Sequence, residues 1–272
     1  MPEIAEVETV RNTLKKRILN RKIMEVKILY PKMIESNIDD FKRILEGKVF
    51  QDIKRRGKWL IFDLGDYYLL SHLRMEGKYF IKPHDEEINK HEHIIFKLDD
   101  GNDLRYHDTR KFGRMNLIRK DELAKAEEIQ KQGYEPGEEG LTKEYLLSKF
   151  KNKRLPIKTV LLDQTIISGL GNIYVDEVLF KSKINPLREA KSLTSDECQR
   201  IVVSSAEIIK EAILMGGTTI RSYTSSLGVT GRFQQNLCVH KRANEPCKTC
   251  GTIIKREKVN GRSTYYCEKC QK

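Results

Sequence analysis

The chain has 272 residues, with 51 Lys and Arg against 39 Asp and Glu, which gives a formal net charge of +12 at neutral pH. This length is enough for one large domain or two ordinary ones, and the basic excess is typical of proteins that bind a polyanion such as nucleic acid, although a generally basic protein stays an alternative. No apolar run is as long as a membrane span and the N-terminus lacks the apolar core of a signal peptide, which excludes membrane and secreted proteins and predicts a soluble intracellular one.

The N-terminus combines a candidate nucleophile with a predicted helix. Apolar residues recur at helical spacing over residues 3–19, with acidic residues near the start and basic residues near the end, as the helix dipole favours. If Met1 is removed, Pro2 presents a secondary amine that titrates near pH ~8 and can attack a sugar carbon to form a covalent iminium. Glu3 follows directly and is close enough to exchange the protons that such chemistry releases. Proline is also common in the first turn of a helix, so Pro2 by itself favours that simpler role.

Short β-rich segments follow from about Lys22 to Arg119, separated by tight turns such as Gly65-Asp66 and Asp100-Gly101-Asn102. The predicted strands, in chain order, are Lys22–Tyr30, Lys48–Arg55, Trp59–Leu64, Tyr67–Leu73, Lys78–Lys82, His93–Leu98, Asp103–His107 and Arg114–Ile118. Many short strands joined by hairpin turns predict a two-layer sandwich or barrel.

The remainder of the chain is mostly helical. The predicted helices are 121–131, 142–150, 156–163, 172–182 and 194–215. The turn Ser168-Gly169-Leu170-Gly171 offers backbone N–H groups and the positive end of the next helix, so it either grips a phosphate or is simply a tight helical corner. Residues 216–236 are rich in Gly, Ser and Thr, and a loop of this length in a compact protein is usually functional or disordered.

Cysteines near the C-terminus have the spacing of a zinc site. The two pairs, each separated by two residues, are Cys247 with Cys250 and Cys267 with Cys270. In a reducing compartment this cluster favours metal over disulfides, and a closed four-thiolate shell makes the Zn²⁺ structural. Residues between the pairs alternate around Asn260-Gly261, a type I′ turn signal, and predict a β-hairpin within Thr252–Tyr266. Cys198 and Cys238 have no paired partner in the sequence and are not predicted ligands.

Three further segments combine charge with apolar or aromatic residues, and each also has a plain structural explanation. They are Arg55–Leu60, His72–Gly77 and Tyr106–Gly113. The first places a basic cluster before an apolar strand, which can also serve to protect a strand edge. In the third, an arginine and a phenylalanine can replace a base extracted from a duplex, or the phenylalanine can belong to the core.

Taken in chain order, these motifs resemble one family, the formamidopyrimidine-DNA glycosylases, which remove oxidised purines from DNA. The resemblance spans the whole chain and rests on the zinc cysteines and on Pro2–Glu8, Arg56–Lys58, His72–Gly77, Arg105–Gly113, Gly169–Tyr174 and Gly216–Thr219. It implies an α+β multidomain fold. The implied domains are an N-terminal helix and β-sandwich over 1–120, a helical helix–two-turn–helix domain with a lesion-capping loop over 121–236, and a zinc finger with a β-hairpin over 237–272.

The resemblance also implies an activity and its catalytic residues. Pro2 would attack C1′ of the damaged nucleotide, and Glu3 would be the acid/base for sugar opening and base departure. Lys58 would serve the strand-cleaving eliminations, and Arg262 would clamp phosphates and assist the second elimination. The implied enzyme is a bifunctional glycosylase and apurinic/apyrimidinic lyase for 8-oxoguanine and formamidopyrimidines, which works through a Pro2 Schiff base and β,δ-elimination.

Other residues match contacts to DNA and to the lesion. Those implied to fill the gap left by the extruded base are Met75, Arg110 and Phe112, and those implied to contact the DNA elsewhere are His91, Lys153, Arg154 and Asn172. The candidates for contacting the flipped lesion are Glu76, Thr218, Thr219, Ile220, Arg221 and Tyr223. The family further implies one structural Zn²⁺, damaged double-stranded DNA as the partner, no membrane, a monomer, and a bacterial, cytoplasmic and nucleoid-associated location.

The chain departs from the usual family pattern at three places. Ile4-Ala5 replaces Leu-Pro next to the catalytic pair, where we expect little effect. Thr109 replaces a proline before Arg110, which is expected to loosen that loop. His240-Lys241 replaces Tyr-Gly before the finger and puts the packing of that segment in doubt.

Two other functions remain open from the sequence. An endonuclease VIII-type enzyme for oxidised pyrimidines shares the Pro-Glu start and the finger, but the Gly-Gly-Thr-Thr loop and the Met75, Arg110 and Phe112 set favour the purine enzyme. A non-catalytic protein that binds damaged DNA would keep the finger and the basic surface but would not need Pro2, Glu3 and Lys58 together.

Overall fold

The computed structural model describes residues 1–218 and 231–272. Thr219, Ile220, Arg221 and Tyr223, named above as lesion contacts, lie outside these residues. The chain divides into two compact units, Met1–Gln130 with Thr218–Gly231 and Lys131–Gly217 with Arg232–Lys272. The predicted domain boundaries at residues 120 and 236 stay a prediction.

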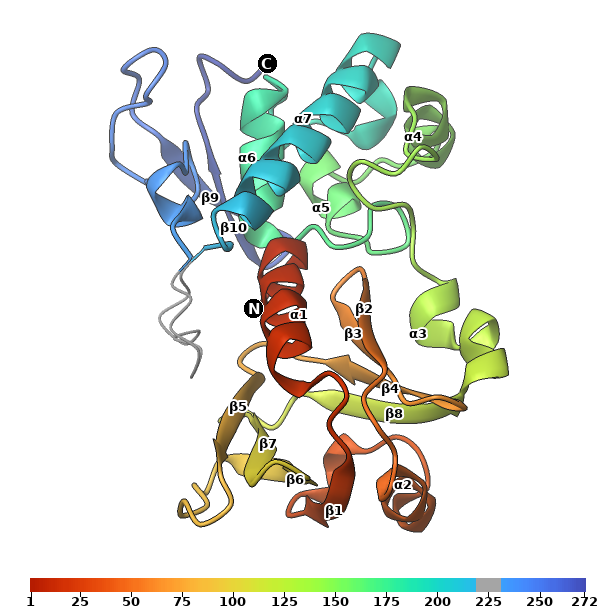
Figure 1. Ribbon diagram of the computed structural model, residues 1–272. Helices are drawn as coiled ribbons and strands as arrows, with labels where there is room; N and C mark the ends of the chain where they lie inside the picture. The colour runs from red at the N-terminus through yellow and green to blue at the C-terminus, as the bar shows by residue number, and fades with distance from the viewer. Residues whose placement is uncertain (219–230) are drawn as a thin grey trace. The chain divides into compact units, whose positions relative to one another are not determined.

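The first unit begins with helix α1 (Ile4–Ile18) and is otherwise mainly antiparallel β-sheet (Figure 1). Within its described residues, two four-stranded sheets have the orders β1-β6-β7-β5 and β2-β3-β4-β8. The strands are β1 (Ile23–Ile28), β2 (Asp52–Arg56), β3 (Trp59–Asp63), β4 (Tyr67–His72), β5 (Lys78–Pro83), β6 (Glu92–Leu98), β7 (Asn102–His107) and β8 (Arg114–Arg119). Each predicted strand is confirmed. The strand predicted over Lys48–Arg55 begins only at Asp52, and the other strands differ by at most two residues at an end.

A single apolar cluster joins α1 to both sheets. It includes Val7 and Leu14 from the helix, Phe62 from one sheet, and Phe96 and Leu104 from the other. The apolar residues spaced along α1 are buried, so burial of this one face holds the helix against the sheets. The arrangement is the predicted two-layer sandwich.

The segment between the first two strands contains elements that the sequence did not predict. They are the short 3₁₀ helix η1 (Pro31–Met33) and helix α2 (Ile38–Leu45). Asn37 caps α2 by accepting a hydrogen bond from the Asp40 N–H at 3.0 Å. The predicted helix over 121–131 is present as η2 (Lys120–Lys125) followed by α3 (Glu127–Gln130).

The second unit is helical and ends in the zinc-finger hairpin. Its elements are α4 (Lys143–Phe150), α5 (Ile157–Leu161), α6 (Asn172–Lys181), η3 (Ala190–Ser192), α7 (Ser195–Leu214), η4 (Phe233–Gln235), β9 (Lys255–Val259) and β10 (Arg262–Tyr266). Helices α6 and α7 lie side by side, and α6 also contacts β10 (Figure 1). A capping box between Thr194 and Glu197 starts α7, as the Thr-x-x-Glu spacing indicates. No helix among residues 1–218 and 231–272 is long and apolar enough to cross a membrane.

Candidate functional site

The start of α1 is buried and held in place by hydrogen bonds. Pro2 and Glu3 are both buried, and Glu3 is the N-cap residue of the helix. The Glu3 N–H donates to Oε2 of Glu6 at 2.9 Å, as expected for a glutamate three residues after the cap. In this chain Met1 precedes Pro2, so the Pro2 nitrogen becomes an amine only after Met1 is removed.

Glu6 also binds Thr218, the residue directly before position 219. Its Oε1 accepts hydrogen bonds from the Thr218 N–H at 2.8 Å and from the Thr218 hydroxyl at 3.0 Å. Both residues are buried. One carboxylate therefore links the Glu3 backbone to Thr218, a predicted lesion contact, although the sequence assigned Glu6 no role.

Lys58 lies in the hairpin turn between β2 and β3. Gly57 has a φ of 55°, which suits the first loop position of a type II′ turn. Lys58 is buried. Burial lowers the pKa of His72 to about 3, and the nearby charges of Arg74 and Lys58 contribute to the shift. His72 is therefore neutral at pH 7 and its Nδ1 accepts a hydrogen bond from the Arg74 N–H at 2.9 Å.

This hairpin is fastened to α1. The Arg55 Nε donates to Glu8 Oε2 at 2.8 Å, and both side chains are largely buried. The first unit thus attaches the strand turn that carries Lys58 to the helix that begins after Pro2 and Glu3.

A carboxylate shapes the loop that presents Arg110 and Phe112. The two oxygens of buried Asp108 accept hydrogen bonds from the N–H groups of Arg110, Phe112 and Gly113 at 3.0, 2.9 and 2.8 Å. Phe112 is 46% exposed, and the Arg110 guanidinium lies 4.7 Å from the centre of its ring. An exposed aromatic ring on a loop that hydrogen bonds hold in shape is suited to enter a base stack.

A second contact brings this loop to the turn that carries Met75 and Glu76. The Thr109 hydroxyl donates a hydrogen bond to Glu76 Oε2. Proline cannot make this bond, which ties Thr109 to the neighbouring turn. The expected loosening of the loop stays a prediction. His91 is also close, since its carbonyl accepts the Asp108 N–H at 2.9 Å.

In the second unit, Asn172 is the first residue of α6 and follows the predicted phosphate-gripping turn. Its Nδ2 donates to the Ser263 carbonyl at 3.0 Å, while its Oδ1 has no hydrogen-bond partner among the described residues. Arg262 is exposed next to Ser263, and Lys153 and Arg154 are exposed before α5. The predicted turn at Asn260-Gly261 is confirmed, with φ values of 43° and 79°.

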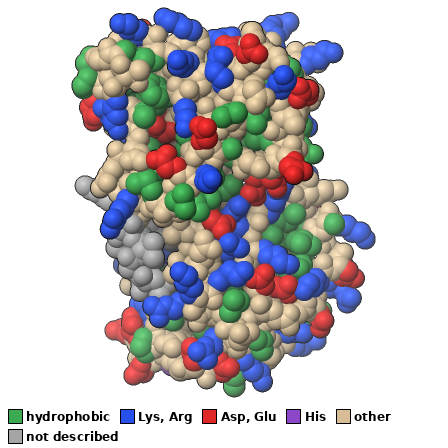
Figure 2. Space-filling model, turned by 45° about the horizontal axis from the view of Figure 1, so that its top comes forward, with side chains coloured by type: hydrophobic (Ala, Val, Ile, Leu, Met, Phe, Trp, Pro, Cys, Tyr) green, Lys and Arg blue, Asp and Glu red, His purple; other side chains and the backbone are tan. Residues whose placement is uncertain are grey.

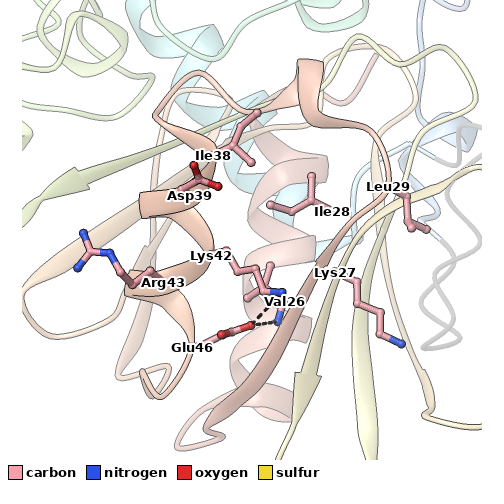
Figure 3. Close-up of a pocket in the computed structure, with 9 residues that line it drawn as sticks. All are labelled: Val26, Lys27, Ile28, Leu29, Ile38, Asp39, Lys42, Arg43 and Glu46. Atoms are coloured by element: carbon pink, nitrogen blue, oxygen red, sulfur yellow. Dashed lines mark hydrogen bonds and ion pairs between the residues drawn. The ribbon is translucent and has the colours of Figure 1, made fainter.

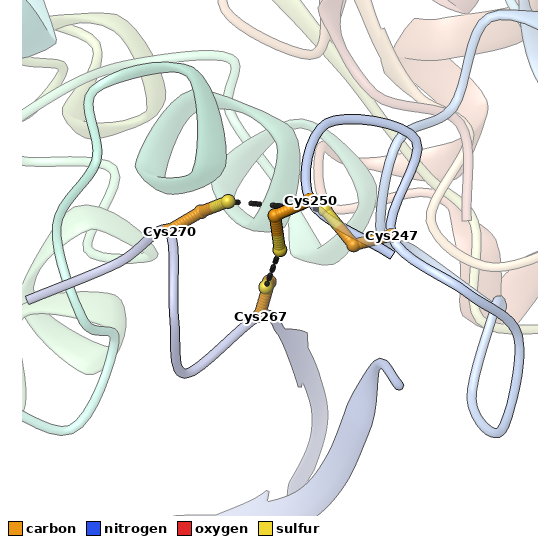
Figure 4. Close-up of side chains that lie close together, drawn as sticks. All are labelled: Cys247, Cys250, Cys267 and Cys270. Atoms are coloured by element: carbon orange, nitrogen blue, oxygen red, sulfur yellow. Dashed lines mark hydrogen bonds between the residues drawn. The ribbon is translucent and has the colours of Figure 1, made fainter. Parts of the chain in front are cut away.

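The four predicted metal ligands lie together in the second unit (Figure 4). Their sulfur atoms are all within 4.8 Å of one another, with 3.9 Å between Cys247 and Cys270 and 3.5 Å between Cys250 and Cys267. A tetrahedral Zn²⁺ with Zn–S bonds of about 2.3 Å requires sulfur separations of about 3.8 Å. The cluster fits one structural Zn²⁺.

Two further surface features are the spread of basic side chains and an open groove. Figure 2 shows Lys and Arg side chains spread over the face that it presents, consistent with the net charge of +12. An open groove of about 720 Å³ lies between β1 and α2 (Figure 3), and of the described residues with a predicted role none lines it.

Comparisons with known proteins cover nearly all of the chain. Residues 1–115 match the formamidopyrimidine-DNA glycosylase N-terminal domain, residues 132–224 match the H2TH domain of the same enzymes, and residues 244–272 match the zinc finger found in FPG and IleRS. The chain is 45% identical over 273 residues to a formamidopyrimidine-DNA glycosylase of Bacillus anthracis, covering 100% of this chain and 99% of the relative.

Solved structures give the same result. A Lactococcus lactis FPG mutant in complex with Fapy-dG-containing DNA has a TM-score of 0.95 and 42% identity, covering 100% of both chains. The complex of Lactococcus lactis Fpg with abasic-site DNA has a TM-score of 0.94 and 42% identity, covering 99% of both chains.

Proposed function

Because the chain belongs to the family of formamidopyrimidine-DNA glycosylases, we propose that it excises 8-oxoguanine and formamidopyrimidines from double-stranded DNA and then cleaves the strand at the abasic site. The observation that carries the proposal is the fastening of the Lys58 hairpin to α1 through Arg55 and Glu8. This ion pair attaches the hairpin with the buried Lys58 to the helix that follows Pro2 and Glu3. The proposed chemistry needs a nucleophile, an acid/base and a second base, and Pro2, Glu3 and Lys58 are assigned to these roles in that order.

The chemistry divides among a few side chains. The Pro2 amine attacks C1′, the bond to the base breaks, and Glu3 exchanges protons with the opening sugar. The resulting iminium makes the C2′ proton acidic, so its removal breaks the C3′–O bond. A second proton loss, from C4′, breaks the C5′–O bond. We assign Lys58 to these eliminations and Arg262 to phosphate binding and the second elimination.

The remaining residues bind and distort the DNA. Phe112, Arg110 and Met75 fill the gap left by the flipped nucleotide, and Glu76 and Thr218 contact the lesion. Lys153, Arg154, Asn172 and His91 bind the DNA outside that gap. Cys247, Cys250, Cys267 and Cys270 would hold the Zn²⁺, which would join the two cysteine turns. The enzyme acts as a monomer in the bacterial cytoplasm, on nucleoid DNA, in keeping with its bacterial relatives.

Excision assays on matched duplexes test the substrate class. Duplexes that differ only in carrying 8-oxoguanine or thymine glycol are incubated with excess enzyme, and the released bases and strand products are measured. We expect faster release of 8-oxoguanine, with Lys58→Met slowing strand cleavage. Preferred release of thymine glycol would instead identify an endonuclease VIII-type enzyme, and release of neither base would leave only a DNA-binding protein.

A further inference from the structure

Three ionisable side chains with no role in the proposed chemistry form a buried network in the second unit. They are Lys158 on α5, Asp176 on α6 and His240 in the segment before the zinc finger. Asp176 Oδ1 lies 2.7 Å from Lys158 Nζ, and Asp176 Oδ2 lies 2.7 Å from His240 Nδ1. Their side chains are 1%, 0% and 5% exposed, in that order. A buried ammonium and carboxylate are stable only when each is paired in this way.

The network ends on the residue that follows Arg262. Lys158 Nζ donates to the Ser263 carbonyl at 2.8 Å, and Asn172 Nδ2 donates to the same oxygen at 3.0 Å. A carbonyl oxygen accepts two hydrogen bonds in favourable directions, so these donors orient the peptide group of Ser263. This peptide group lies in β10, one residue after Arg262.

His240 is itself held at its backbone and at its ring. Glu177 Oε1 accepts the N–H groups of Val239 and His240 at 3.0 and 2.8 Å, and burial raises the pKa of Glu177. The His240 ring contacts the ring of Tyr265 on β10, with 5.0 Å between centroids. Two successive carboxylates of α6 therefore fix this segment, one through its backbone and one through the imidazole.

We propose that His240 is a positioning residue for Arg262. By bonding to Asp176 it keeps that carboxylate on Lys158, and Lys158 in turn holds the Ser263 carbonyl and the start of β10. The inference rests on the proposed role of Arg262 in the second elimination.

The two eliminations give different products, which makes the role of His240 measurable. A duplex with one abasic site is incubated with excess zinc-loaded full-length enzyme, and the 3′-unsaturated aldehyde of the first elimination is separated from the 3′-phosphate of the second. His240→Phe keeps a ring against Tyr265 but removes the bond to Asp176. We expect it to slow the second elimination roughly tenfold while the first changes little.

His240→Asn is the matched variant, since its amide places a donor near the position of Nδ1 and removes the ring. It should keep the product ratio of the unmodified enzyme. Zinc content and thermal melting report on folding. If His240→Phe does not fold, the double variant Lys158→Met with Asp176→Asn removes both charges together, leaves no unpaired buried ion, and should show the same slowed second step.

The variant Arg262→Ala distinguishes failure of the proposed role of His240 from failure of the proposed role of Arg262. If Arg262→Ala slows the second elimination but folded His240→Phe or the double variant does not, His240 has no positioning role. If Arg262→Ala leaves the product ratio unchanged, the proposed role of Arg262 is itself wrong and the inference falls with it. An equal loss of both eliminations in His240→Phe also contradicts the proposal, because it indicates general damage.

Discussion

Buried carboxylates organise the loops of this protein by accepting hydrogen bonds from backbone N–H groups. Asp108 accepts three such bonds within its own loop, and Glu177 accepts three from residues 238–240. Glu6 joins the N–H groups of Glu3 and Thr218. Hydrogen bonds to a charged acceptor are stronger than neutral ones, so each carboxylate fixes a segment that has no regular structure of its own.

Glu6→Gln tests the most central of these carboxylates. Glutamine can place an NH₂ group toward donors that now face an oxygen, so at least one of the bonds to Glu3 or Thr218 is lost. We expect a loss of about 1–3 kcal/mol in unfolding free energy and slower base excision. Urea unfolding and single-turnover excision of 8-oxoguanine measure the two effects. Glu25→Gln, which alters a surface pair with Lys97, is the control; equal behaviour of both variants would contradict the role of Glu6.

Lys241 adopts a backbone conformation that favours glycine, the residue common in the family at this position. Its φ is 62°, and its side chain is exposed. A non-glycine residue in this region costs about 1–2 kcal/mol, part of which is offset by the greater freedom of glycine in the unfolded chain.

Lys241→Gly should therefore raise the unfolding free energy by up to about 1 kcal/mol, seen as a higher Tm. Asn244, with a φ of 68°, supplies the control, because asparagine tolerates this conformation and Asn244→Gly should gain less. A lower Tm for Lys241→Gly would show that the lysine makes a stabilising contact.

Features that depend on residues close together in the sequence could be predicted, whereas contacts between residues far apart in the sequence could not. The cysteine pairs and the Asn260-Gly261 turn follow from local spacing alone. The bond of Glu6 to Thr218 joins residues 212 positions apart, and that of Asp176 to His240 joins residues 64 positions apart. No local pattern marks such pairs, because they depend on how whole elements pack.

At the scale of elements, the strength of the periodic pattern decided what could be predicted. The strands are bounded by clear turn residues, and α1 and α7 bury long apolar faces. Helix α2 buries only Phe41 and Leu45, a single i,i+4 pair, so its sequence carries too little periodicity to be recognised.

His72, the last residue of β4, makes the stability of the β-sandwich depend on pH. The folded-state pKa of His72, about 3, lies below the value of about 6.5 expected for the unfolded chain. Between these values the unfolded chain binds a proton that the folded one does not, so stability falls as pH falls from about 6.5 toward 3. One such site contributes up to about 1.4 kcal/mol per pH unit.

Urea unfolding at a series of pH values between 7 and 4 measures this slope. His72→Gln removes the titrating ring and should flatten the curve relative to the unmodified protein. The pKa values of His93 and His107 are also lowered by burial, so part of the slope should remain. Parallel curves for the two proteins would contradict the assignment to His72.

At the scale of the whole molecule, the order of motifs along the chain was the strongest guide. The family, the sandwich, the helical region and the zinc hairpin could all be predicted because each has a local signature and the signatures occur in sequence. The grouping of Thr218 with residues 1–130 could not, because it depends on the contact of Thr218 with Glu6.

The central claim is that the Pro2 amine becomes bonded to the DNA. Borohydride reduction during turnover on an 8-oxoguanine duplex, followed by digestion and mass spectrometry, locates the trapped sugar. We predict an intact protein mass that lacks Met1, one DNA adduct per chain, and the sugar on Pro2, with no adduct in a form that keeps an N-terminal extension. No adduct on the unextended protein, or an adduct located on Lys58 or another lysine, would contradict the mechanism.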